Sequence, residues 1–151
     1  MGWYNKVSSD ISNIPAAVAY FETELTGAKA DCRISGNVER AAAAMPGIVE
    51  HRYNQLQEIE AILEYLNIEL RRLKSHHFKK YLETYSRALS SRDVDRYVDG
   101  EPDVVDYEKI INEFALMRNK WLGITKALEN KSFSISGIIR LRVAGMEDAT
   151  I

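Results

Sequence analysis

Basic side chains gather in two stretches of the 151-residue chain. Residues 71 to 96 hold eight basic and three acidic residues, a net +5, and residues 118 to 142 hold six basic and one acidic, also +5. Residues 1 to 70, with five basic and ten acidic residues, carry −5, and the whole chain has a formal net charge of only −2. A local patch of this kind attracts a polyanion even to a mildly acidic protein.

Aromatic residues are interleaved with the first basic stretch: Phe78, Tyr81 and Tyr85 lie among its lysines and arginines. Single-stranded nucleic acid binds to such surfaces, because cations follow the phosphates and ring faces stack on unpaired bases. Phe78 and Tyr85 share helical spacing with leucines, which favours core packing, whereas Tyr81 lies off that stripe. A solvated basic helix face is the alternative interpretation. The residues predicted to bind nucleic acid are Arg71, Arg72, Lys74, Lys79, Lys80, Tyr81 and Arg87.

No pattern in the sequence predicts catalysis or a metal site. His76 and His77 are adjacent, so on a helix they would point about 100° apart and would not chelate one ion together. The glutamates between residues 58 and 69 lack an accompanying Glu-x-x-His. Cys32 is the single cysteine, which favours a reducing, cytosolic compartment. We therefore expect a non-enzymatic protein without cofactor or metal.

Two long helices are predicted to position the basic side chains. Apolar residues recur at spacings of three and four from 56 to 73, and again from 107 to 128, so each set lies on one side of a helix. Stripes this long and narrow need a partner. The predicted fold is mainly α, with a long antiparallel hairpin of helices over residues 46–90 and 104–130 and short helices at both ends.

Turn and cap residues define the ends of these helices. Pro46 can open the first helix, because its missing N–H would have no partner in the first turn. Gly100 and Pro102 separate the two helices, and Asp103 can cap the second. In such a hairpin we expect the two basic stretches to meet at least in part.

Residues 1–36 form an N-terminal extension. Asn13 can cap a short amphipathic helix with Pro15 in its first turn, and residues 26 to 36 suit either a short strand or an extended connector. Residues 37 to 44 suit a brief separate helix. At 151 residues, with 46% apolar and 28% charged content, the chain suits one domain. It has no apolar run long enough for a membrane span, and its polar first residues lead us to expect no signal peptide.

The C-terminal segment, residues 133–145, is rich in Ile and Val, and its periodicity favours a packed helix, with a short strand as the alternative. Its apolar side chains exceed what a thin hairpin can cover, so they either pack against another subunit or fold back onto the hairpin. The residues predicted to mediate homo-oligomerisation are Phe133, Ile135, Ile138, Ile139 and Leu141.

Three segments together point to a known family. They are Lys79-Lys80-Tyr81-Leu82-Glu83-Thr84-Tyr85-Ser86, the helix start Asp103-Val104-Val105, and Phe133-Ser134-Ile135 followed by Ile138-Ile139, Arg142 and Gly145. In this order they resemble the UvsY family of phage recombination mediators, which bind single-stranded DNA and help load a recombinase. The resemblance covers residues 37 to 146 and leaves the first 36 without a counterpart.

The resemblance is not uniform. Tyr81 stands where the family has its second basic residue, Thr84 replaces a tyrosine, and Arg87 replaces a glycine, so only Lys79 matches the DNA-contacting segment cleanly. The resemblance implies a ring-shaped homo-oligomer in the host cytoplasm, with single-stranded DNA, a recombinase and a single-strand binding protein as partners.

Three hypotheses follow. The first is a non-enzymatic recombination mediator that binds single-stranded DNA. The second is a helical scaffold or assembly protein of a phage, which self-associates through its heptad stripes. The third is an adaptor that binds one protein partner through its long helix.

Overall fold

The structure, a computed structural model, describes residues 2–84 and 89–145. Its regular elements are all helices, and no strand occurs among these residues. In chain order they are α1 (Trp3–Ser9), the short 3-10 helix η1 (Ile11–Asn13), α2 (Ile14–Asp31), α3 (Val38–Thr84), α4 (Ser91–Asp99) and α5 (Pro102–Val143). The predicted mainly α fold is confirmed.

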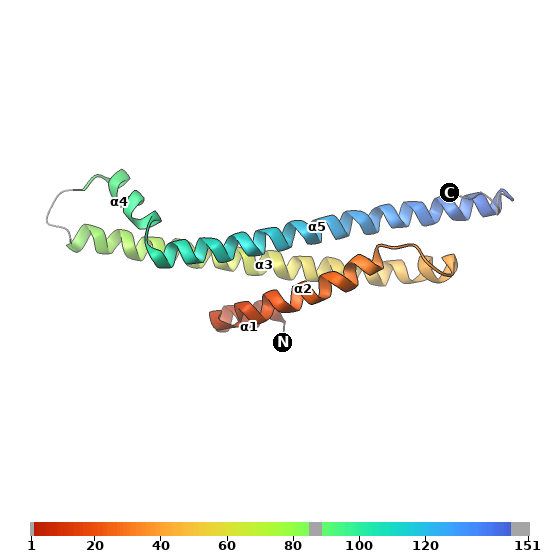
Figure 1. The fold of residues 1–151 in the computed structure, drawn as a ribbon, viewed down its shortest axis with the longest axis horizontal. Helices are drawn as coiled ribbons and strands as arrows, with labels where there is room; N and C mark the ends of the chain where they lie inside the picture. The colour runs from red at the N-terminus through yellow and green to blue at the C-terminus, as the bar shows by residue number, and fades with distance from the viewer. Residues whose placement is uncertain (1, 85–88, 146–151) are drawn as a thin grey trace.

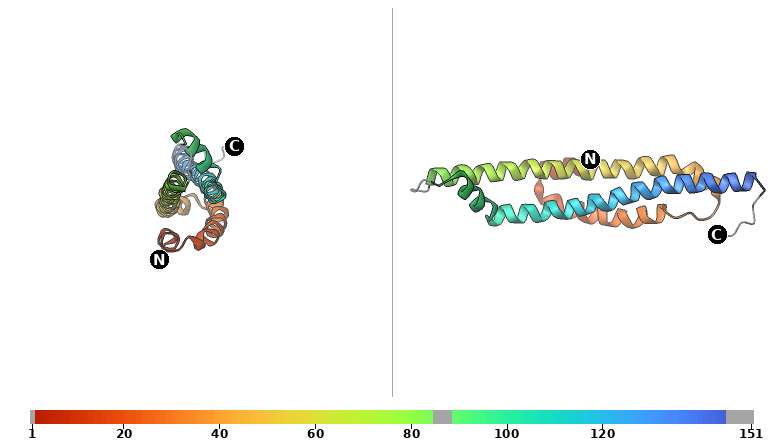
Figure 2. Two further views of the ribbon diagram at one scale, coloured as in Figure 1. Left: turned by 90° about the vertical axis from the view of Figure 1, so that its left-hand side faces the viewer. Right: turned by 90° about the horizontal axis from the view of Figure 1, so that it is seen from above.

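The two longest helices, α3 and α5, run antiparallel and side by side (Figure 1). α3 has 47 residues and α5 has 42. At ~1.5 Å per residue each helix spans roughly 60 to 70 Å. The predicted long hairpin is therefore present, and α1 and α2 lie along one side of it (Figure 2). No helix in the described part of the chain has an apolar stretch that could cross a membrane.

α3 begins at Val38, and Pro46 lies inside it. The prediction that Pro46 opens the helix, and that residues 37 to 44 form a separate one, was wrong. Asn37 caps α3, since its Oδ1 accepts the N–H groups two and three residues further on, at 2.8 and 3.2 Å. A proline inside a helix costs about 3 kcal/mol, because it removes a backbone hydrogen bond. The added turns bury Val38 and Met45 in the core, which offsets this cost.

α3 is described as far as Thr84. Residues 85–88, which the prediction placed in the same helix, lie outside the described residues. By Ser90 the chain has begun a new element: the Ser90 hydroxyl accepts the backbone N–H of Asp93 at 3.2 Å and caps α4. The predicted boundary at residue 90 therefore marks the start of α4.

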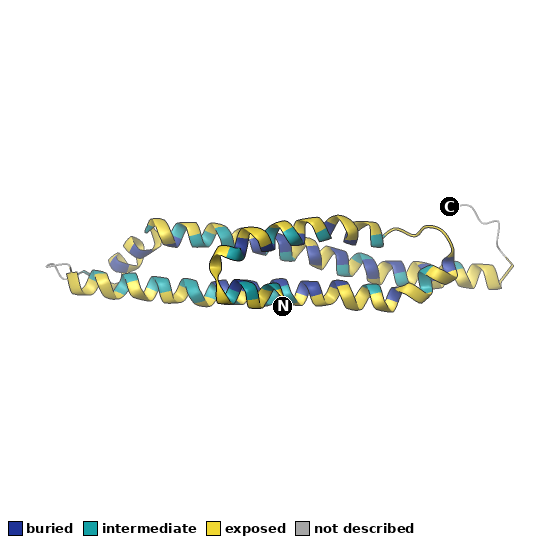
Figure 3. Ribbon diagram, turned by 90° about the horizontal axis from the view of Figure 1, so that it is seen from below, coloured by how far each residue is buried: buried dark blue, intermediate teal, exposed yellow. Residues whose placement is uncertain are grey.

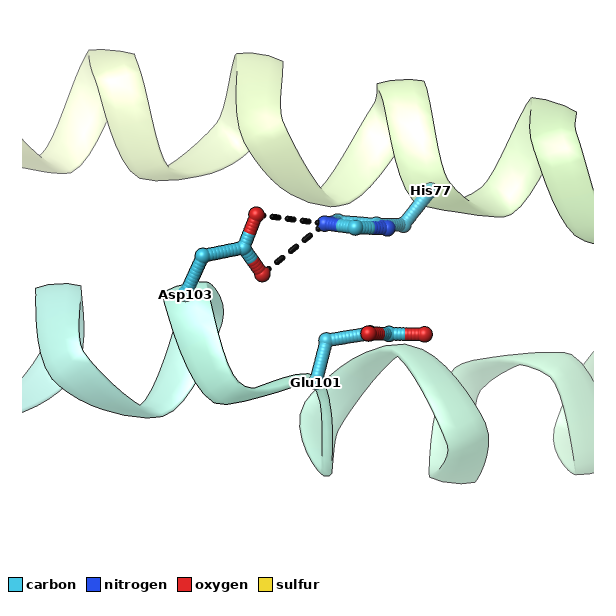
Figure 4. Close-up of side chains that lie close together, drawn as sticks. All are labelled: His77, Glu101 and Asp103. Atoms are coloured by element: carbon cyan, nitrogen blue, oxygen red, sulfur yellow. Dashed lines mark hydrogen bonds and ion pairs between the residues drawn. The ribbon is translucent and has the colours of Figure 1, made fainter.

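α5 begins at Pro102, in a first turn where a missing N–H is tolerated. Asp103 was predicted to cap this helix, and that prediction was wrong. Glu101 is the N-cap residue, and Asp103 lies in the first turn with its carboxylate directed at His77 (Figure 4). The reason is that Pro102 already has helical φ, so the helix starts before Asp103.

α5 continues through Asn130, its predicted end, to Val143. The prediction of a separate C-terminal helix was therefore wrong, and so was the alternative of a strand. Gly137 lies inside the helix at an exposed position and costs only ~1 kcal/mol there relative to alanine. Burial of Ile135 on the same helix offsets that cost. Gly145, with φ +77°, lies just beyond the end of the helix.

The N-terminal extension is more helical than predicted. Ile14, Phe21 and Leu25 form a buried face, as expected, but α2 continues to Asp31. Residues 32–37 form a connector without a strand. α1 was not predicted from the sequence, and it buries Val7 against the hairpin.

The described residues form two apolar cores. The larger core joins α1, α2, α3 and α5 around Trp121, Phe114 and Phe21. The smaller core lies at the closed end of the hairpin, where Val94 and Val98 of α4 pack with the start of α5 and with the last turns of α3. Buried positions concentrate on the facing sides of the helices, and both ends of the hairpin are mostly exposed (Figure 3).

One polar network anchors α2 to α3. Arg52, with a side chain only 9% exposed, donates to Asp31 and Glu24 at 2.8 Å each and to Gln55 at 3.0 Å. Its guanidinium lies 5.9 Å from the ring centroid of Trp121 in α5. Three helices therefore meet at one arginine.

Candidate nucleic-acid interface

The two basic stretches lie at opposite ends of the hairpin (Figure 1). His77 contacts Asp103 near the closed end, whereas Arg52 lies over Trp121, so residues 118–142 adjoin the first half of α3. The prediction that the two stretches meet was wrong. α5 runs away from the closed end for about sixteen residues, roughly 24 Å, before its first residue of the second stretch.

Four of the predicted nucleic-acid-binding residues lie on the exposed outer side of α3: Arg71, Arg72, Lys79 and Lys80. The side chains of Arg71, Arg72 and Lys79 are 72%, 75% and 77% exposed. Each pairs with a glutamate of the same helix, at 3.7, 3.0 and 3.9 Å respectively. Glu64 and Glu83 are exposed and Glu69 is partly buried, and pairs at a surface contribute only about 0 to 1 kcal/mol. A phosphate can therefore replace these glutamates at little cost.

Lys74 lies on the inner side of α3. Its Nζ is 3.2 Å from an oxygen of Asp99 and 3.3 Å from one of Glu108. Burial by itself would lower the pKa of Lys74, but the hydrogen bonds to these two carboxylates outweigh it and hold the pKa above its ordinary value. Lys74 thus joins α3 to α4 and α5, and a phosphate would have to displace two carboxylates to reach it.

Tyr81 also faces α4 and α5. Its hydroxyl donates a hydrogen bond to Glu101, and its ring stacks on Tyr97 with centroids 5.7 Å apart and planes 22° from parallel. The ring packs against the smaller apolar core. Stacking of this ring on a base would have to replace contacts within the protein. Arg87, the last of the predicted set, lies outside the described residues.

An acidic segment lines this inner side. Residues 99 to 108 hold five acidic side chains and no basic one, so residues 71 to 108 hold eight of each sign. The acids contact the inward-facing residues Lys74, His77 and Tyr81. The acidic side chains therefore lie between α3 and the start of α5, whereas the four cations lie on the outer side of α3.

The contact between His77 and Asp103 was not predicted from the sequence. Nε2 of His77 lies 2.8 and 2.9 Å from the two carboxylate oxygens of Asp103. The hydrogen bond with His77 is the main cause that lowers the pKa of Asp103. The sequence did indicate such a contact, because the register of the apolar stripe places residue 77 on the side of the helix that faces the second helix.

The five residues predicted to mediate oligomerisation divide into two groups. Ile135 is buried in the larger core and Ile138 packs against it. Phe133, Ile139 and Leu141 are exposed, Phe133 by 78%. The end of α5 extends past the start of α3, which leaves its last turns without a neighbouring helix (Figure 1). Their role in oligomerisation stays a prediction.

The chain matches no protein-family model, and neither the curated proteins nor the solved structures contain a match to it.

Proposed function

We propose that the protein binds single-stranded DNA and acts as a recombination mediator that helps load a recombinase. The observation that supports this most is the outer side of α3, where Arg71, Arg72, Lys79 and Lys80 are exposed and pair, among the described residues, at most with glutamates of the same helix. Binding to phosphates releases counterions from the nucleic acid, which favours association with such a surface.

The mediator role itself rests on the resemblance to the UvsY family. The first of the three segments that carry the resemblance begins at Lys79, so the best-matching residue and the exposed cations coincide in the last turns of α3. A recombinase and a single-strand binding protein are the partners that this role requires. The proposed role needs no catalytic group.

Fluorescence anisotropy with a labelled 30-nucleotide single strand, at several salt concentrations and beside a duplex control, tests the DNA-binding step. One variant carries alanine at Arg71, Arg72, Lys79 and Lys80. A matched control carries alanine at two lysines and two arginines near the other end of the hairpin, Lys120, Lys126, Arg140 and Arg142. All four of these are exposed.

We expect the first variant to lose most of its affinity and the control to keep it. Each lost phosphate contact lowers the log–log salt slope by about 0.7, so four contacts lower it by about 3. Equal losses in both variants would mean that binding follows total charge. Unchanged binding in the first variant would refute the proposed surface.

A second function, self-assembly as a helical scaffold protein, is favoured by the exposed apolar side chains at the end of α5. Phe133 and Val143 are 78% and 85% exposed. Sedimentation equilibrium of the wild type and of Phe133→Ser measures this association, with Leu116→Ser, at another exposed apolar position of α5, as the control. A scaffold would show an oligomer that only Phe133→Ser weakens, together with no DNA binding. A wild-type monomer would exclude it.

A further inference from the structure

We propose that His77, Glu101 and Asp103 bind one divalent transition-metal ion at the closed end of the hairpin, with Zn²⁺ as the ion that suits the site best. The three side chains come from α3, from the N-cap of α5 and from its first turn (Figure 4). One ligand atom from each lies within 4.8 Å of the other two. This inference does not depend on the proposed DNA binding.

The distances suit a single ion. Zinc lies ~2.0 to 2.2 Å from nitrogen and oxygen ligands, so two of its ligand atoms are about 3 to 4 Å apart. Nε2 of His77 is 2.8 and 2.9 Å from the oxygens of Asp103, so the two side chains would move apart by roughly 0.5 Å to admit the ion between them. The ligand atom of Glu101 lies within 4.8 Å of the other two, so a movement of about 1 Å would bring it into the same range.

The ligand set selects the class of metal. Ca²⁺ and Mg²⁺ prefer sites built from oxygen alone, whereas one imidazole with two carboxylates suits Zn²⁺ and similar transition metals. His77 would bind the ion as the neutral imidazole, through the lone pair of Nε2 and with its proton on Nδ1. Water would complete the coordination. A cavity of about 170 Å³ lined by Lys80, Tyr81, Thr84 and Glu101 adjoins the site and provides room for it.

The carboxylates are held in place by further hydrogen bonds. The N–H of Val104 donates to Asp103 Oδ1 at 2.9 Å, and the hydroxyl of Tyr81 donates to Glu101. The His77 side chain is only 12% exposed, so packing restricts its ring. Outer hydrogen bonds of this kind orient metal ligands and strengthen binding.

In the described part of the chain, neither neighbouring lysine is ion-paired with Glu101 or Asp103. Lys74 is shared between Asp99 and Glu108, and Lys80, which lines the cavity beside Glu101, is exposed. A bound ion would join α3 to the start of α5, two helices that are separated in sequence by α4. Its expected physical effect is to stabilise the closed end of the hairpin.

Isothermal titration calorimetry of the full chain, freed of metal with EDTA and titrated with ZnCl₂, tests the inference. The variants are His77→Asn, Asp103→Asn and Glu101→Gln, the last of which keeps an acceptor for Tyr81. His76→Asn is the matched control, because His76 is the adjacent histidine and is exposed. Circular dichroism establishes that each variant is folded.

We expect one Zn²⁺ per chain in the wild type and in His76→Asn, and at least a tenfold loss of affinity in each of the other three variants. Zn²⁺ should raise the melting temperature of the wild type and leave that of Glu101→Gln unchanged, and Mg²⁺ should do neither. Absence of a stoichiometric site in the wild type would overturn the proposal. So would an affinity that Glu101→Gln leaves intact or that His76→Asn lowers equally.

Discussion

Replacing Arg52 by methionine should destabilise the protein more than any substitution of an exposed charge. Arg52 is one of the few buried charged residues among those described, and it holds α2 on the hairpin through Asp31 and Glu24. Methionine keeps the length and the apolar stem of the side chain. It removes all of the hydrogen-bond donors.

The magnitude follows from what remains after the arginine is lost. Removal of one partner from a fully buried ion pair costs ~3 to 5 kcal/mol, because a charge stays buried alone. The side chains of Glu24 and Asp31 are 31% and 28% exposed, so water can reach them and the cost falls toward the lower end. Gln55, which is 5% exposed, also loses a donor to its side-chain oxygen. We expect a loss of about 3 kcal/mol.

Urea unfolding followed by circular dichroism measures this loss. With a slope of ~1.5 to 2 kcal/mol per molar urea, 3 kcal/mol moves the midpoint by roughly 1.5 to 2 M. Arg40→Met, at an exposed position of α3, is the control and should change stability by no more than ~0.5 kcal/mol. Adding Glu24→Gln and Asp31→Asn to the Arg52 variant should restore part of the loss, because the isolated charges are then gone.

Two results would refute this reasoning. A wild-type midpoint in Arg52→Met would mean that the network contributes nothing to stability. Strictly additive losses in the triple variant would mean that the buried charges do not interact. In either case α2 would be held by its apolar face alone.

Two further predictions concern α3 and its network. Pro46→Ala should stabilise the protein by ~1 kcal/mol or more, because it restores a backbone hydrogen bond and improves helix propensity; a higher urea midpoint checks this. Hydrogen bonds from Gln55 and then Arg52 lower the pKa of Glu24 below 4.5 in the folded state. Its contribution to stability is therefore complete above pH 4.5 and is lost as pH falls through the folded pKa. Urea midpoints of the wild type and Glu24→Gln, measured from pH 7 to pH 3, should converge as pH falls, and a constant difference would contradict this assignment.

Apolar periodicity was sufficient to predict the pairing of α3 with α5. The three-four spacing from Leu56 to Leu73 and from Tyr107 to Leu128 marks two sides that each need a partner, and the structure brings them together. The helix ends were harder to predict. Pro46 was treated as the start of a helix because of its low propensity inside one, but burial of neighbouring residues outweighs that propensity.

The location of the positive charge could not be read from local composition. Net charge over a stretch of sequence counts side chains without regard to direction, whereas a helix points successive residues about 100° apart. Arg71 and Lys79 therefore face solvent while Lys74 faces α5. Residues 118–142 lie away from the basic stretch of α3 because α5 runs antiparallel to α3. The predicted hairpin already implied this direction.

The polar residues on the seam carried information that the sequence could have provided. Past Leu73 the stripe register on α3 reaches His77, and in the structure Lys74 and Tyr81 lie on the same inner side of the helix. A polar group at a seam position must find a polar partner across it. The partners are Glu108, Asp103 and Glu101, so each step of three or four residues along α3 is matched by a step back along the start of α5. Such matching is what an antiparallel register requires. These contacts engage Glu101, Asp103 and Glu108 within the chain, so these acids do not neutralise the four cations on the opposite side of α3, the surface that we propose binds a phosphate backbone.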